Sequence, residues 1–68
     1  MGGKKLTSRD RELLQLLQDG LKNREIAVRL GLAEQTVKNY LAVLSERCGV
    51  TNRVQLAMKA ASVLRSGE

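Results

Sequence analysis

Apolar positions along the chain recur at the three- and four-residue spacing of helices, and they divide the sequence into four helical segments. The first segment begins at Thr7, a good N-cap, with Asp10 placed three residues further on to point back to it. It should end at Gly20, and its apolar face consists of Leu13, Leu14, Leu16 and Leu17. No segment shows a strand pattern that exceeds the helical one, so the sequence predicts an all-α domain.

The second and third segments are short and are separated by a glycine. The second is expected to begin after Asn23, a strong N-cap residue, and to end before Gly31. Gly31 suits the turn because it takes a positive φ without a Cβ clash. The third is expected to span residues 34–48, after Ala33, and to stop at Gly49. Two short helices joined by a three- or four-residue glycine turn cross steeply, as in a helix-turn-helix unit, whose second helix presents its N-terminal end to the DNA major groove.

The third segment has one apolar face and one polar face. Its core-facing stripe is formed by Val37, Leu41, Leu44 and Cys48, with Tyr40, the only aromatic residue, at its edge. The opposite side carries the polar residues Gln35, Lys38 and Asn39. Lysine donates to guanine O6 and N7, and asparagine or glutamine pairs with adenine N6 and N7. We therefore predict base contacts by these three residues; the alternative is the solvated polar face of any amphipathic helix.

The fourth segment should begin near Thr51 or Asn52 and run to about Leu64. Its apolar residues cover roughly 220° of the helical wheel, more than the ~100° of a single buried face. One sector suits the domain core and consists of Leu56, Ala57, Ala60, Val63 and Leu64. A second sector, edged by Arg65, consists of Val54, Met58 and Ala61. This second sector predicts pairing with another copy of the helix, or else packing against a partner domain of a longer chain.

The composition limits the classes of function. The chain has 68 residues, enough for one domain, and its 12 Lys and Arg against 7 Asp and Glu give a net charge of +5. This balance favours a polyanionic partner, nucleic acid before anionic membrane, unless it serves solubility alone. A single Cys and no His leave no disulfide framework, zinc site or catalytic constellation, so we expect no enzyme, cofactor or small-molecule ligand. A lone Cys fits a reducing cytosol, and no apolar run reaches a membrane span of ~20 residues.

Several motifs together resemble one family of regulators. They are LTSRDRELL in the first segment, NREIAVRLGL before the turn, EQTVKNYL after it and CGVTNRVQLA leading into the fourth segment. Residues 6 to about 60 thereby resemble the LuxR-type helix-turn-helix domain, also called the GerE or NarL/FixJ type. The resemblance implies a bacterial transcription factor domain in which the third helix reads DNA and the fourth forms a dimer. One departure is Ala33, where the family usually has Ser or Thr.

The resemblance also places contacts on particular residues. Base contacts fall on Gln35, Lys38 and Asn39. The residues themselves, rather than the resemblance, give candidates for contacts to the DNA backbone: Asn23, Arg24, Thr36, Tyr40, Arg47 and Arg53. Each has a plainer alternative: an N-cap role for Asn23, a local hydroxyl bond for Thr36, core packing for Tyr40, and an ordinary surface charge or i,i+4 ion pair for the arginines. The dimer seam falls on Val54, Met58 and Ala61.

We expect residues 1–5 to be a flexible leader, 6–65 the DNA-binding domain and 66–68 a frayed tail. The function expected is sequence-specific binding of double-stranded DNA in the bacterial nucleoid, as the C-terminal output domain of a response regulator, with RNA polymerase as a further candidate partner. A stand-alone GerE-like regulator and a helical protein-interaction module are the alternatives. Region 4 of a sigma factor is disfavoured by the fourth apolar helix. RNA binding is disfavoured by the absence of an aromatic stacking platform.

Overall fold

The computed structural model describes residues 6–65, and within them the chain forms four helices and no strand. The predicted leader (1–5) and tail (66–68) lie outside the described residues. The helices are α1 (Ser8–Gln18), α2 (Asn23–Leu30), α3 (Glu34–Cys48) and α4 (Arg53–Arg65). The all-α prediction is confirmed, and each predicted helix is present within one or two residues of its expected bounds.

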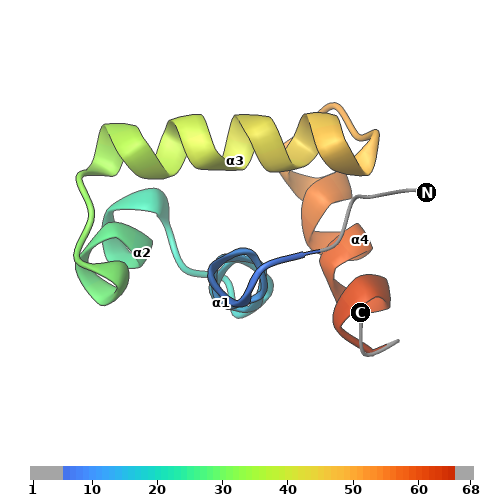
Figure 1. The fold of residues 1–68 in the computed structure, drawn as a ribbon, viewed down its shortest axis with the longest axis horizontal. Helices are drawn as coiled ribbons and strands as arrows, with labels where there is room; N and C mark the ends of the chain where they lie inside the picture. The colour runs from blue at the N-terminus through green and yellow to red at the C-terminus, as the bar shows by residue number, and fades with distance from the viewer. Residues whose placement is uncertain (1–5, 66–68) are drawn as a thin grey trace.

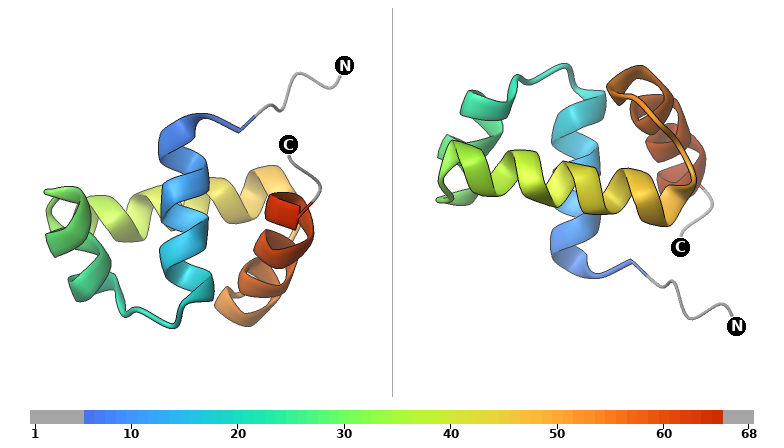
Figure 2. Two further views of the ribbon diagram at one scale, coloured as in Figure 1. Left: turned by 90° about the horizontal axis from the view of Figure 1, so that it is seen from below. Right: turned by 90° about the horizontal axis from the view of Figure 1, so that it is seen from above.

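The four helices are arranged so that one long side of α3 stays uncovered. In Figure 1, α3 lies along one side of the molecule, α1 runs beneath it and is seen nearly end-on, and α2 and α4 stand toward its two ends. The views in Figure 2 show that α1 crosses α3 at a steep angle. α2 packs mainly on α3, and α4 packs mainly on α1. No other described helix lies over the outer side of α3 (Figures 1 and 2).

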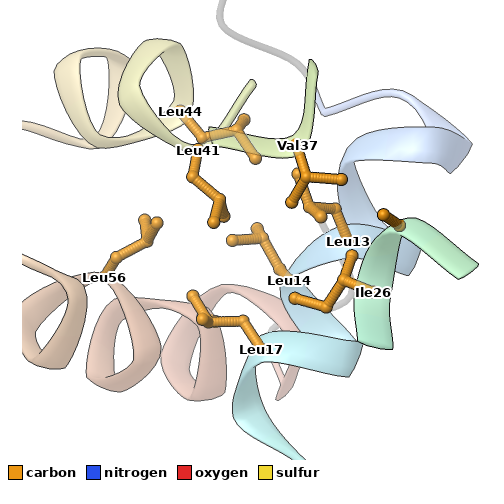
Figure 3. Packing of buried hydrophobic residues seen from close by; sticks show 10 residues of the cluster. Leu13, Leu14, Leu17, Ile26, Val37, Leu41, Leu44 and Leu56 are labelled. Atoms are coloured by element: carbon orange, nitrogen blue, oxygen red, sulfur yellow. The ribbon is translucent and has the colours of Figure 1, made fainter. Parts of the chain in front are cut away.

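The core lies at the centre, between α1 and α3, and all four helices contribute to it (Figure 3). The buried residues are Leu13, Leu14, Leu17, Ile26, Ala27, Val37, Leu41, Leu44, Leu56 and Ala60. The predicted stripe of α3 is confirmed for its first three members, but Cys48, expected to be buried, is only half-buried. Cys48 is the last residue of α3 and packs against the edge of the core.

Local capping explains where the first two helices begin. At α1, the Asp10 amide donates to Thr7 Oγ1 and the Thr7 amide donates to Asp10 Oδ2, both at 3.0 Å, so the predicted Thr7 cap is confirmed. At α2 the predicted cap is wrong. Asn23 is the first helical residue, and the N-cap is Lys22, whose amide donates to Glu25 Oε1 at 2.8 Å. The Asn23 side chain instead accepts a hydrogen bond from Arg53.

The predicted glycine turn between α2 and α3 is confirmed. Gly31 has φ of 69°, and the following amide, that of Leu32, donates to the Ala27 carbonyl at 2.9 Å. This closes α2 with the left-handed residue typical of helix C-termini. A Cβ at Gly31 would meet no atom within 4 Å, so the backbone conformation rather than space requires glycine. The turn ends at Ala33, which has an extended conformation with ψ of 149° and gives α3 no side-chain cap.

The missing cap leads to a stability prediction. Ala33→Ser should stabilise the domain by about 1 kcal/mol, because a serine hydroxyl in this extended N-cap conformation accepts from a free amide of the first turn of α3. The melting temperature should rise by about 4–8 °C for a domain of this size. Ala42→Ser is the matched control: it adds the same hydroxyl at an exposed position inside α3, where serine is a poorer helix former than alanine. Equal effects of the two substitutions would contradict the assignment of Ala33 as N-cap.

Candidate nucleic-acid interface

The three predicted base-contact residues lie in the first half of α3 and are all exposed. Gln35 and Asn39 are one helical turn apart, and the Gln35 Nε2 group donates to Asn39 Oδ1 at 3.1 Å. Lys38 and the neighbouring Thr36 are also exposed. These side chains surround the first turns of the helix that follows the glycine turn. The sequence prediction that they share the side of α3 away from the core agrees with their exposure.

Lys38 also lines an open groove that brings together residues from three helices. The groove runs between α3 and the starts of α2 and α4, and Asn23, Lys38 and Arg53 all line it. Its other lining residues are Leu41, Ala42, Ser45, Glu46, Val50, Thr51, Asn52 and Leu56. Two of the predicted backbone-contact residues therefore lie beside one of the predicted base-contact residues.

Arg53 connects the start of α4 to the start of α2. Its Nη1 donates to Asn23 Oδ1 at 2.6 Å, and its Nη2 donates to the Leu21 carbonyl at 2.7 Å. From the sequence, the alternatives for Arg53 were an ordinary surface charge or an i,i+4 ion pair. The observed bonds are neither, because they join residues about thirty positions apart. A guanidinium has five N–H donors in a fixed plane, so a side chain anchored in this way keeps donors for a further acceptor.

On the other flank of α3, Asp10 joins α1 to two side chains of α3. Asp10 is 2% exposed, and its side chain accepts from the Tyr40 hydroxyl at 2.6 Å and from Arg47 Nη1 at 3.4 Å. The Tyr40 ring is half-buried and packs against the core, as its plainer alternative proposed. Its single hydroxyl proton is donated to Asp10 and is not available to a phosphate while this bond is formed. Tyr40 thus serves the fold here.

The contacts between Asp10 and Tyr40 shift the pKa values of both the Asp10 carboxyl group and the Tyr40 hydroxyl group. Burial alone raises the pKa of Asp10, but the hydrogen bonds from Tyr40 and Thr7 and the charge of Arg47 outweigh burial, and the net pKa lies below its ordinary 3.8. Burial and the hydrogen bond to Asp10 raise the pKa of Tyr40 above its ordinary 10.0. A lowered carboxyl pKa stabilises the fold at pH values above 3.8, and this stabilisation is lost as the pH falls through the folded-state pKa.

Tyr40→Phe should therefore cost more stability at neutral pH than in acid. Near pH 7 the loss is expected to be about 1.5–3 kcal/mol, since a hydrogen bond to a charged group is removed from a buried carboxylate. The loss should become smaller as the pH falls below 3.8 and through the lowered folded-state pKa of Asp10, because protonation of the carboxylate weakens the same bond in the wild type. Urea unfolding of both proteins over a series of pH values from neutral into acid measures this difference. A cost that stays constant after Asp10 of the wild type has been protonated, as followed by NMR titration, would contradict a charged Asp10 as the acceptor of the Tyr40 bond.

Several features were not predicted from the sequence. Asp10 was expected only as a capping partner, yet it also joins α1 to α3. Arg9 Nη1 donates to the Leu30 carbonyl at 3.4 Å, close to the end of α2. Val28 of α2 is 77% exposed and Val43 of α3 is 50% exposed, although neither was assigned a role. Arg24, a predicted backbone contact, is exposed on α2 near Val28.

The predicted dimer residues form a stripe along α4. Val54 and Met58 are each 68% exposed, and Ala61 is half-buried. They are spaced at i, i+4 and i+7, which places them on one face of the helix. The predicted core sector faces inward: Leu56 and Ala60 are buried, and Ala57, Val63 and Leu64 are half-buried. Val54 and Met58 are thus more exposed than every member of the core sector, whereas Ala61 has the same intermediate exposure as Ala57, Val63 and Leu64.

The part of the chain that the structure describes contains neither a metal-binding cluster nor a membrane-spanning helix. Among residues 6–65, no group of three or more Cys, Asp or Glu side chains is arranged to hold a metal ion. None of the described helices has the length and apolarity required to cross a membrane.

Comparison with known proteins identifies the family. The model of the GerE family, described as bacterial regulatory proteins of the luxR family, matches residues 4–60. The chain is 48% identical over 61 residues to the DNA-binding transcriptional activator DevR/DosR of Mycobacterium tuberculosis, covering 90% of this chain and 28% of that protein. It is 40% identical over 50 residues to the transcriptional regulatory protein DesR of Bacillus subtilis, covering 74% and 25%. With UhpA of Escherichia coli the identity is 43% over 54 residues, covering 79% and 28%.

The chain spans about a quarter of the length of these curated relatives. The family comprises DNA-binding transcription regulators rather than enzymes, in agreement with the expectation drawn from the sequence. The match extends over all four sequence motifs and over most of the described helices. The chain therefore belongs to the LuxR family of bacterial regulatory proteins.

Proposed function

We propose that this domain binds double-stranded DNA in a sequence-specific manner, with α3 in the major groove. The observation that supports this function best is the exposed set Gln35, Lys38 and Asn39, which lies in the first half of α3 directly after a helix-turn-helix turn. α3 is also the helix whose outer side no other described helix covers (Figures 1 and 2). An α-helix fits the major groove, and the N-terminal half of a recognition helix is the part that meets base edges. In this arrangement Lys38 contacts a guanine and Asn39 contacts an adenine.

Backbone contacts come from residues around α3. Arg24 is exposed at the start of α2 and Thr36 at the start of α3, and Arg53 is held beside Asn23 and Lys38 at the groove. Arg47 lies on the opposite flank, where its side chain is 32% exposed and pairs with Asp10. Phosphate contacts of this kind fix the orientation of a protein on DNA without specifying sequence. Tyr40 is left out of this set because its hydroxyl already donates to Asp10.

The proposed assembly on DNA is a two-fold dimer through α4. The stripe Val54, Met58 and Ala61 provides an apolar seam that the described domain itself leaves largely exposed. Two copies related by such a seam present two recognition helices to successive major grooves, about 34–36 Å apart. We further propose that the domain is the output part of a longer bacterial response regulator that acts in the cytoplasm, since its relatives are regulators about four times longer. Recruitment of RNA polymerase stays a prediction.

Binding to duplex DNA, measured by fluorescence anisotropy at several salt concentrations, tests the proposed function. Each phosphate neutralised by Lys or Arg should contribute about −0.9 to the slope of log K against log salt. Single-stranded RNA of the same length is the comparison ligand, and it should bind more weakly because the domain has no aromatic stacking platform. Absence of duplex binding at low salt would favour the helical protein-interaction module, for which the exposed Val54 and Met58 are the supporting observation.

A further inference from the structure

The hydrogen bond between Gln35 and Asn39 joins two residues that were expected to read bases separately. The Gln35 Nε2 group donates to Asn39 Oδ1 at 3.1 Å, across one turn of α3, and both side chains are exposed. We propose that Gln35 is a positioning residue, which holds the Asn39 amide in the orientation required to read one adenine. The inference rests on the proposed function, and it specifies how the recognition helix obtains its base preference.

The chemistry of an amide makes its orientation decisive. The asparagine side chain has a carbonyl oxygen at one end and an NH₂ group at the other, and rotation by about 180° exchanges them. Adenine offers an N6 donor and an N7 acceptor in the major groove, so Asn39 must present its oxygen to N6 and its nitrogen to N7. In the opposite orientation two donors would face each other and so would two acceptors. An exposed asparagine without a partner gains nothing from one orientation over the other before DNA arrives.

The bond from Gln35 removes this ambiguity without using a group that the base requires. It fixes the oxygen of the Asn39 amide toward the start of α3. A carbonyl oxygen has two lone pairs, so one remains to accept from adenine N6. Both hydrogens of the Asn39 NH₂ group remain to donate to N7. Ordering the side chain before binding also lowers the entropy cost of the contact, which strengthens the preference for the correct base.

Lys38, unlike Asn39, needs no neighbouring side chain to orient it before it contacts a base. An ammonium group carries three equivalent donors and no acceptor, so its rotation does not change what it offers to guanine O6 and N7. Lys38 also lies on the groove side of α3, among Asn23, Arg53 and the start of α4. Loss of Gln35 should therefore relax the adenine preference and leave the guanine preference unchanged.

A double-mutant cycle on base preference tests the coupling. A duplex selected by the wild-type domain is compared with a duplex in which the adenine read by Asn39 is replaced, using the wild type, Gln35→Ala, Asn39→Ala and the double variant. Gln35→Ala should reduce the ratio of the two affinities about fivefold, and Asn39→Ala should remove the preference. The double variant should be no worse than Asn39→Ala, because Gln35 acts through Asn39.

Two further variants separate positioning from general effects on the fold. Gln35→Glu keeps the length of the side chain but replaces the donor by an acceptor, so it should turn the Asn39 amide round and lower the adenine preference further than Gln35→Ala. Gln15→Ala is the matched control, because Gln15 Nε2 donates to Asp19 Oδ1 at the same 3.1 Å and the same i,i+4 spacing, at the C-terminal end of α1. This control should leave the base preference unchanged.

The outcomes distinguish the inference from the proposed function. Gln35→Ala could instead relax the base preference at a different position, with the fold-changes of Gln35→Ala and Asn39→Ala multiplying in the double variant. In that case Gln35 reads its own base and the positioning role is wrong. If Gln35→Glu keeps the adenine preference of the wild type, the direction of the hydrogen bond has no importance and the inference is likewise overturned. If the wild-type domain selects no duplex sequence, the proposed function itself is contradicted.

Discussion

Lys38→Ala should weaken binding to the selected duplex by about 5- to 150-fold, which corresponds to ~1–3 kcal/mol, and should relax the preference for guanine at one position. The physical reason is that Lys38 is exposed on the first half of α3 and offers donors to O6 and N7. Affinities for the selected duplex and for a duplex changed at that one position measure both effects. A Lys38→Ala domain with full sequence preference would contradict direct readout by this residue.

The control for this experiment should remove a phosphate contact and leave the fold intact. Arg53→Ala would weaken binding to all sequences alike if Arg53 contacted phosphates alone. Arg53, however, is bonded to Asn23 and to the Leu21 carbonyl, so its removal loosens the start of α4 as well as a phosphate contact. Arg24 is exposed on α2, and Arg24→Ala should weaken binding to all duplexes to a similar extent and leave base preference intact.

Met58→Asp should abolish cooperative binding to a duplex with two half-sites while sparing binding to a single half-site. The substitution places a charge at the centre of the stripe formed by Val54, Met58 and Ala61, where a two-fold seam would bring two such charges together. The seam is small, so the cooperativity should depend on DNA, which raises the local concentration of the second copy. Titration of one-site and two-site duplexes with the same protein measures the effect.

Lys59→Ala is the control for the change in net charge, because it also lowers the charge by one and Lys59 is exposed on the same helix about 100° round from Met58. It should weaken both duplexes alike through the loss of a positive charge and should preserve cooperativity. Unchanged cooperativity of Met58→Asp would show that α4 is not the dimer seam. The exposed stripe would then be assigned to packing against another domain of a longer regulator.

The helices and their order could be predicted from the sequence because local signals define them. Thr7 and Asp10 cap α1 within four residues, and Gly31 and Gly49 end α2 and α3 with left-handed conformations that follow from their own backbone freedom. The apolar spacing of α3 predicted its buried face, and the excess apolar surface of α4 predicted its exposed stripe. All of these signals act over one or two helical turns.

The features that the sequence did not predict depend on contacts between distant residues. Tyr40 and Arg47 meet Asp10 across 30 and 37 positions, and no local pattern indicates that meeting. Asn23 was assigned as an N-cap because its residue type favours that role, yet Arg53, 30 positions away, binds its side chain and Lys22 takes the cap position. The Gln35–Asn39 bond is different, since i,i+4 spacing alone makes such a pair feasible.

Selection of sequences from a random library of duplex DNA by the wild-type domain tests whether this protein binds DNA sequence-specifically. We expect an enriched motif with two related half-sites whose centres lie about 10 bp apart, one helical turn, as required by a two-fold pair of recognition helices. Each half-site should contain the guanine and the adenine that Lys38 and Asn39 contact. Recovery of no enriched sequence, under low-salt conditions in which the domain retains its fold, would contradict sequence-specific DNA binding by this protein.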